Sequence, residues 1–169
     1  IGITVPEIET AAKFLEEAFG ATAIYDNVIP SDPPQSGAEA EATLGFAKGS
    51  AIVHMRMMRI GDGACIELFE MKVQGNVKKD IIPSDIGLQH FAVYTEDIMV
   101  TKDKFEKAGG RLLKGPNEML GREGGEGNQF MYGVTPWGTF VELITYPSEL
   151  AIEKKTPLRR WKLKPGKNE

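Results

Sequence analysis

Apolar and polar positions follow one order of spacings along the chain, and this order occurs twice. In the first occurrence, residues 1–5 alternate between apolar and small or polar side chains, which predicts a strand. Apolar residues then recur at helical spacing over 7–19, and Gly20 is expected to end that helix. Further strands are expected over 21–25, 50–60 and 64–71, and the segment 26–45 is expected to be mostly loop, with a short helical turn at 39–44.

The second occurrence begins at His90 and repeats the order strand, helix, strand, strand, strand. A strand is expected over 90–95 and a helix over 97–108, which the pair Gly109-Gly110 ends. A short strand over 111–114 and a glycine-rich stretch over 121–127 follow. The strands 129–134 and 139–146 are expected to form a hairpin around residues 136–138.

The two occurrences align residue by residue. A shift of 90 places Glu7 on Asp97 and Ile8 on Ile98, whereas a shift of 75 places Glu67 on Glu142. The loop after Tyr25 absorbs the difference of 90 − 75 = 15 residues. A repeat of this size indicates two copies of one supersecondary module. We therefore expect an α+β fold with module one at 1–72, a linker at 73–87, module two at 88–147 and a basic C-terminal tail at 148–169.

Composition narrows the functional classes. The 169 residues suffice for one domain with a real core, and a net charge of −4 gives no reason to expect nucleic acid. No run approaches the roughly 18 apolar residues that span a membrane. The single cysteine, Cys65, allows no intrachain disulfide and fits a reducing compartment, so we expect a cytoplasmic protein. No signal peptide is recognised, and the native N-terminus is expected to lie upstream of Ile1, because the chain starts inside an alternating run.

Three side chains carry candidate chemistry. Glu67 and Glu142 stand at matching positions in the last strand of each module, and His90 opens the first strand of module two. In a curved sheet, side chains from these strands can point into one shared cleft, where imidazole and carboxylate are the usual ligands of a divalent first-row metal. Taken singly, each glutamate also fits a solvent-facing strand position, and His90 fits a structural histidine. His54 has no counterpart in the repeat and is interpreted as structural.

The tail carries basic residues and one tryptophan: Lys154, Lys155, Arg159, Arg160, Lys162, Lys164, Lys167 and Trp161. We interpret it as a solvated arm or a segment that packs on a partner subunit. A lid that senses an anion over the pocket is the alternative.

Four stretches of the chain, 1–21, 66–68, 90–98 and 136–143, resemble the vicinal oxygen chelate superfamily. This superfamily includes glyoxalase I, bleomycin-resistance proteins and extradiol dioxygenases. The resemblance covers about residues 1–147 and implies two βαβββ modules that form a curved mixed sheet, a glyoxalase-like cup, around one metal ion. It implies that Glu67, His90 and Glu142 are ligands, with a histidine expected just before Ile1 as the fourth.

The resemblance also implies a function. A glutamate at the position of Glu67 favours the isomerase and lyase branch, which would act on a small substrate with adjacent oxygens through an enediolate-type intermediate. Ni, Zn, Co or Mn is the expected metal. One alternative is an extradiol dioxygenase with Fe(II), and another is a non-catalytic small-molecule-binding or resistance protein. Residues 135–138 depart from the Asp-Pro-Asp-Gly of glyoxalase I, so a glutathione thioester is not the expected substrate.

The expected roles follow from position. Glu142 is the first choice for the catalytic base and Glu67 the second. Arg122, in the glycine-rich loop, is a candidate to hold a substrate carboxylate. Arg56 and Arg59 lie on the strand that faces Glu67, and one of them could point into the cup, although pairing with surface acids is an equal alternative. We expect a small-molecule substrate and a homodimer, with no nucleic-acid or membrane partner. Whether the modules pair within one chain or between two stays open.

Overall fold

The computed structural model describes residues 1–45, 47–74, 81–84 and 86–159, and it consists of two modules of the same design. The elements of module one are β1 (Gly2–Val5), α1 (Ile8–Phe19), β2 (Thr22–Val28), β3 (Gln35–Ser36), α2 (Ala38–Leu44), β4 (Ala51–Arg59) and β5 (Cys65–Lys72). The elements of module two are β6 (His90–Tyr94), α3 (Ile98–Lys107), β7 (Arg111–Leu112), β8 (Asn117–Glu118), η1 (Gly121–Glu123), β9 (Gln129–Val134), β10 (Phe140–Thr145) and η2 (Ala151–Lys154).

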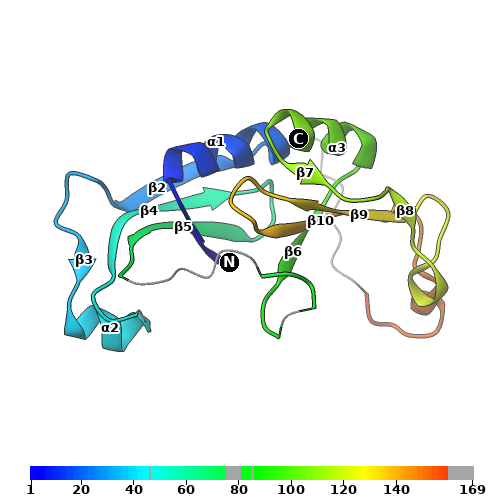
Figure 1. The fold of residues 1–169 in the computed structure, drawn as a ribbon. Coiled ribbons are helices and arrows are strands. Elements are labelled where there is room, and N and C mark those ends of the chain that lie inside the picture. The colour runs from blue at the N-terminus through cyan, green and yellow to red at the C-terminus, as the bar shows by residue number, and fades with distance from the viewer. Residues whose placement is uncertain (46, 75–80, 85, 160–169) are drawn as a thin grey trace, which may run out of the picture.

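Each module builds one mixed sheet with the same strand order. Module one has the order β1-β5-β4-β2 and module two the order β6-β10-β9-β7, while β3 and β8 pair with the third strand of their sheets. In each sheet the first strand is parallel to its neighbour and the other pairs are antiparallel. Figure 1 shows the two sheets side by side, with α1 and α3 next to each other on the same side of both. The expected α+β fold of two βαβββ modules is confirmed.

Strand register reproduces the duplication seen in the sequence. Gly2 pairs with Glu67 between β1 and β5, and Ala92 pairs with Glu142 between β6 and β10. These pairs differ by 90 in the first strand and by 75 in the last, which are the shifts of the sequence repeat. The two modules therefore place Glu67 and Glu142 at equivalent points of their sheets.

Helices α1 and α3 begin at equivalent acidic caps. The carboxylate of Glu7 accepts from the Thr10 N–H at 3.0 Å, and that of Asp97 accepts from the Met99 and Val100 N–H groups at 2.9 and 3.0 Å. Such bonds satisfy donors that the first helical turn leaves without partners. At its far end, α1 stops at Gly20, whose φ of 66° is a left-handed conformation that glycine adopts without a Cβ clash.

The two modules share one core between their helices. The Phe14 ring of α1 meets the Phe105 ring of α3 and the Trp137 ring of module two edge-on, each with centroids 5.2 Å apart. Residues from both sheets join the same cluster, among them Leu68 of β5 and Leu143 of β10, which are fully buried. The helix-covered faces of the two sheets therefore form one continuous interior. Burial of the aromatic rings and their edge-to-face packing both stabilise it.

The tail differs from the expected solvated arm over its first part. Leu150 and Glu153 are buried, Leu150 packs with residues of module two, and the Ala151 N–H bonds to the Gly124 carbonyl at 3.0 Å. Residues 148–155 thus cover one end of module two. The basic residues from Arg160 onward lie outside the described residues. None of the helices in the described ranges has the length and apolar character that crossing a bilayer requires.

Candidate functional site

Side-chain alternation along the last strands separates two faces of each sheet. In β10, Val141 and Leu143 point to the helices and are fully buried, whereas Glu142 points to the other face. In β5, Leu68 is buried in the same core and Glu67 points away from it. We call this second face of each sheet the cup face. Both candidate glutamates therefore lie on cup faces.

His90 and Glu142 come together on the cup face of module two. His90 Nε2 lies 3.9 Å from Glu142 Oε2, and the two side chains are 27% and 15% exposed. The parallel pairing of β6 with β10 sets this approach, since His90 stands opposite Phe140 and one pleat from Glu142. The structure thus brings together two of the three side chains that the sequence proposed as ligands.

The surroundings of His90 favour a free lone pair on Nε2. Its other ring nitrogen, Nδ1, contacts the Gln89 Oε1 atom. An acceptor oxygen at that place favours the tautomer with the proton on Nδ1, which leaves Nε2 as an acceptor toward Glu142. A cation between Nε2 and the Glu142 carboxylate would accept both lone pairs.

Tyr132, which sequence analysis did not single out, completes this corner. It lies directly opposite Glu142 in the β9–β10 ladder, and its ring meets the His90 ring edge-on at 5.2 Å. Burial raises the pKa of the Tyr132 phenol, and the negative charges of Glu142 and Glu123 raise it further. The hydroxyl therefore keeps its proton at neutral pH and can donate to a substrate oxygen. The predicted hairpin could have revealed it, because both residues lie five positions from Trp137 at the centre of the turn.

The donor set fits part of a metal site. Two ligands about 2.1 Å from one ion lie about 3.0–3.4 Å apart, so the pair His90–Glu142 needs to close by roughly 0.5–0.9 Å. Within the described ranges, no three His, Cys, Asp or Glu side chains lie close enough together to hold a metal. Glu67 is therefore not brought to His90 and Glu142 within this chain. It lies between Gly2 of β1 and Met57 of β4 on the cup face of module one.

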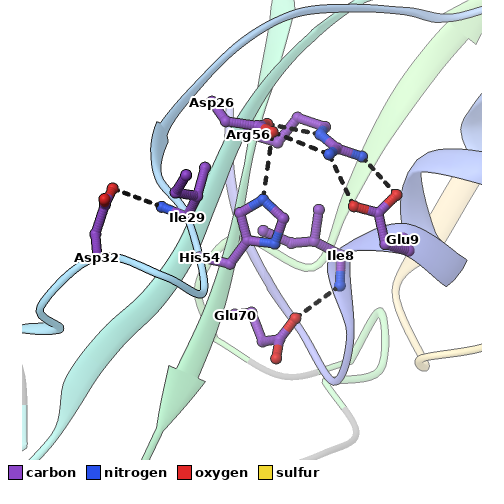
Figure 2. Close-up of polar contacts among 8 residues, drawn as sticks. All are labelled: Ile8, Glu9, Asp26, Ile29, Asp32, His54, Arg56 and Glu70. Atoms are coloured by element: carbon purple, nitrogen blue, oxygen red, sulfur yellow. Dashed lines mark hydrogen bonds and ion pairs between the residues drawn. The ribbon is translucent and has the colours of Figure 1, made fainter.

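Arg56 lies on the face of β4 that the helix covers. Its guanidinium donates to both carboxylate oxygens of Asp26, at 2.7 and 3.0 Å, and of Glu9 on α1, at 2.9 and 2.8 Å. Figure 2 shows this arrangement, with the buried His54 next to Asp26, at 3.5 Å between Nε2 and Oδ2. Arg56 is thus tied to two acids away from the cup face, which is the pairing that sequence analysis gave as the alternative to a place in the cup. His54 belongs to this cluster, in line with its structural interpretation.

The other two candidate arginines keep exposed positions. Arg59 stands opposite Cys65 of β5. Cys65 lies two residues before Glu67 on that strand, so Arg59 and Glu67 share the cup face. Arg122 lies in η1, next to Glu123, whose charge reaches Tyr132. Both side chains are exposed and able to turn toward a ligand.

A family model matches residues 1–132 of this chain, which is more than half of it; its description is Glyoxalase/Bleomycin resistance protein/Dioxygenase superfamily. The chain belongs to this superfamily. The expected membership in the vicinal oxygen chelate proteins is thereby confirmed.

Relatives within the superfamily agree with the fold and point to an isomerase. The chain is 27% identical over 161 residues to a 2-epi-5-epi-valiolone epimerase from Actinomyces sp, covering 94% of this chain and 84% of the relative. This likeness supports an isomerase-type enzyme. A glyoxalase family protein from Bacillus cereus has a TM-score of 0.66 at 18% identity, over 86% of this chain and 90% of that one. The trypanothione-dependent glyoxalase I of Leishmania major has a TM-score of 0.56 at 16% identity, over 86% and 83%. These two structures show the fold alone.

Proposed function

We propose that this chain is a metal-dependent isomerase that moves a proton on a carbon beside an oxygen of a small hydroxyketone. The observation that carries the proposal is the approach of His90 Nε2 and Glu142 Oε2 to 3.9 Å on the cup face of module two. The epimerase relative supports the reaction class, and its substrate name, which denotes a ketone, supports the substrate class.

His90 and Glu142 would hold the cation, with Glu67 as a further ligand. Since Glu67 does not reach the pair within one chain, we propose that the site forms between two copies in a homodimer. Ni, Zn, Co and Mn suit this imidazole and carboxylate donor set. When bound, such an ion supplies Lewis-acid stabilisation of negative charge that develops on the substrate oxygens.

The side chains of the chain itself divide the remaining work. Glu142 is proposed to take the proton from carbon and to return it, with Glu67 as the second choice. Tyr132 would donate its hydroxyl proton to a substrate oxygen, since burial and two nearby acids keep it protonated. Arg59 and Arg122 would orient the substrate from the edges of the cup. Arg56 has no part in this scheme, because Glu9 and Asp26 hold it on the other face.

The test is exchange of the substrate proton with solvent. Purified protein loaded with Ni, Zn, Co or Mn is incubated in D₂O with 2-epi-5-epi-valiolone and with simpler hydroxyketones, and products are followed by NMR. The proposal predicts an epimer that carries deuterium at the inverted carbon. Glu142→Gln should lower the rate at least a hundredfold, whereas the control Glu16→Gln, on the exposed side of α1, should not change it. Equal rates in the Glu142→Gln variant and the native protein would contradict the proposal, as would the absence of exchange with all four metals.

A further inference from the structure

The two modules are not equivalent where they meet, and the difference leaves a cavity. A cavity of about 570 Å³ lies between the end of α1, the β4–β5 turn at 60–64, β6 from Phe91 to Thr95, and α3. A second cavity of about 260 Å³ lies along β1 and beside the β9–β10 turn at 137–139, and residues 88–91 also line it. Neither Glu142 nor Tyr132 lines the larger cavity, so it lies apart from the proposed active site.

The two turns share one hydrogen bond but differ in backbone conformation and in side chains, since Gly138 has a φ of 95° whereas the aligned Gly63 does not lie in the left-handed region. Gly63 donates to Ile60 at 3.0 Å in the first turn, and Gly138 donates to Thr135 at 3.0 Å in the second. The shift of 75 then places Asp62 at the position of Trp137. Trp137 packs on Phe14 and closes its side of the molecule, whereas Asp62 is exposed and leaves the equivalent space open.

The helix walls differ in the same sense. Under the shift of 90, Phe14 of α1 corresponds to Lys104 of α3, and Ala11 corresponds to Thr101. Phe14 and Ala11 are buried, 2% and 1% exposed, whereas Thr101 is half-buried and Lys104 is exposed. At the positions of this aromatic contact, the larger cavity has an acid, Asp62, and a base, Lys104, in its lining. Duplication from one module explains the shared shape, and substitution on one side explains the space.

The walls specify the chemistry of an occupant. Apolar side chains form the floor, including Phe19, Ile66 and Phe91. On the rim, the Thr95 and Thr101 hydroxyls lie 2.6 Å apart and bond to each other. Within the described ranges, the Lys104 ammonium has no acid within ion-pair distance. An apolar floor beside an unpaired cation suits an anion with an apolar body. The negative charge of Asp62 would repel the charged group of this anion, which would then lie near Lys104.

We propose that this cavity is a second ligand site, for a small organic anion with an apolar body such as an aromatic carboxylate. Its volume lies within the range of about 300–1,000 Å³ that small-molecule pockets have. The occupant would lie along β6, the strand that begins with His90. The proposal is independent of the isomerase function.

Three probes of one shape test the site: 2-naphthoate, the neutral 2-naphthalenemethanol and the cationic 2-naphthylmethylammonium. Calorimetry and saturation-transfer NMR should show that the native protein prefers the anion. Lys104→Met should weaken naphthoate binding at least tenfold and change binding of the alcohol less than twofold. Lys107→Met, on the same helix but outside the cavity, should change neither. Asp62→Trp, which introduces the side chain that Trp137 has in the other turn, should fill the cavity and abolish binding of both naphthoate and the alcohol.

The proposed active site supplies a further control. Glu142→Gln should leave naphthoate binding unchanged, and its loss in this variant would place the probe in the cup and overturn the proposal. Failure of naphthoate to bind the native protein would also overturn the proposal. This holds even if the reason is that a second copy of the chain covers the cavity. If Asp62→Trp does not fold, Lys104→Phe fills the cavity from the opposite wall, and persistent binding in that variant would be equally decisive.

Discussion

Arg56 and Arg59 lie three residues apart on β4 and therefore on opposite faces of the sheet. One meets the acids of α1 and β2, and the other shares the cup face with Glu67. At the scale of single residues, this alternation decides which arginine can meet a substrate and which one holds the fold together.

Arg56→Met should lower the free energy of unfolding by about 2 kcal/mol, because it leaves Asp26 without the hydrogen bonds to a charged partner that compensate its partial burial. Urea denaturation measures the change. Arg59→Met, a matched change on the same strand, should alter stability by less than about 0.5 kcal/mol but raise the KM for the substrate. If both variants lost the same stability, the assignment of the two faces would be wrong.

The same cluster predicts a dependence of stability on pH. The hydrogen bond from Arg56 lowers the pKa of the Asp26 carboxyl, although burial opposes the shift. A group whose pKa is lower in the folded state stabilises the fold above its unfolded pKa of about 3.9, and this contribution is lost as the pH falls through the folded value. Asp26→Asn should therefore lose less stability than the native protein between pH 5 and pH 2, measured by urea denaturation. Parallel plots of unfolding free energy against pH for the two proteins would contradict this prediction. The plot for Asp26→Asn should still fall at low pH, because Arg56 also lowers the pKa of Glu9.

At the scale of elements, the repeat fixes where helices start as well as where strands lie. Glu7 and Asp97 align in sequence and cap α1 and α3 in the structure. The caps therefore start the two helices at equivalent points after the first strand of each module.

Asp97→Ala should cost about 1 kcal/mol, because two backbone N–H groups of the first turn of α3 lose their acceptor. Thermal and urea denaturation measure this loss. Asp103→Ala, in an exposed position within the same helix, serves as the control and should cost less than about 0.5 kcal/mol. A cost for Asp103→Ala equal to that of Asp97→Ala would argue against capping as the cause.

Periodicity in the sequence was enough to predict the long elements. Residues 7–19, 50–60 and 97–108 carry clear periodic patterns and agree with α1, β4 and α3 to within a few residues. The short strands β3 and β8 have two residues each, which is too few to establish a period, and pairing with β4 and β9 creates them. The candidate site was predicted in part for a similar reason. Repeat alignment finds His90 and Glu142, but Tyr132 and the place of Arg56 depend on strand register and alternation.

At the scale of the whole molecule, duplication explains both the proposed active site and the second cavity. Equivalent strands place Glu67 and Glu142 alike, and the shared helical core leaves the two cup faces at different places in one chain. A site that needs ligands from both modules then requires the approach of another copy, as we propose. Differences between the modules, such as Asp62 at the position that Trp137 holds in module two, lie at the second site that we propose.

The central claim is that His90, Glu142 and Glu67 hold one divalent cation. Equilibrium titration of metal-free protein with Co or Zn, followed by calorimetry, tests this claim most directly. The account predicts one ion per chain, with at least a hundredfold weaker binding in each of the variants His90→Ala, Glu142→Gln and Glu67→Gln, and native affinity in the control Glu16→Gln. Native affinity in Glu67→Gln, or no binding by the native protein at micromolar metal, would contradict it.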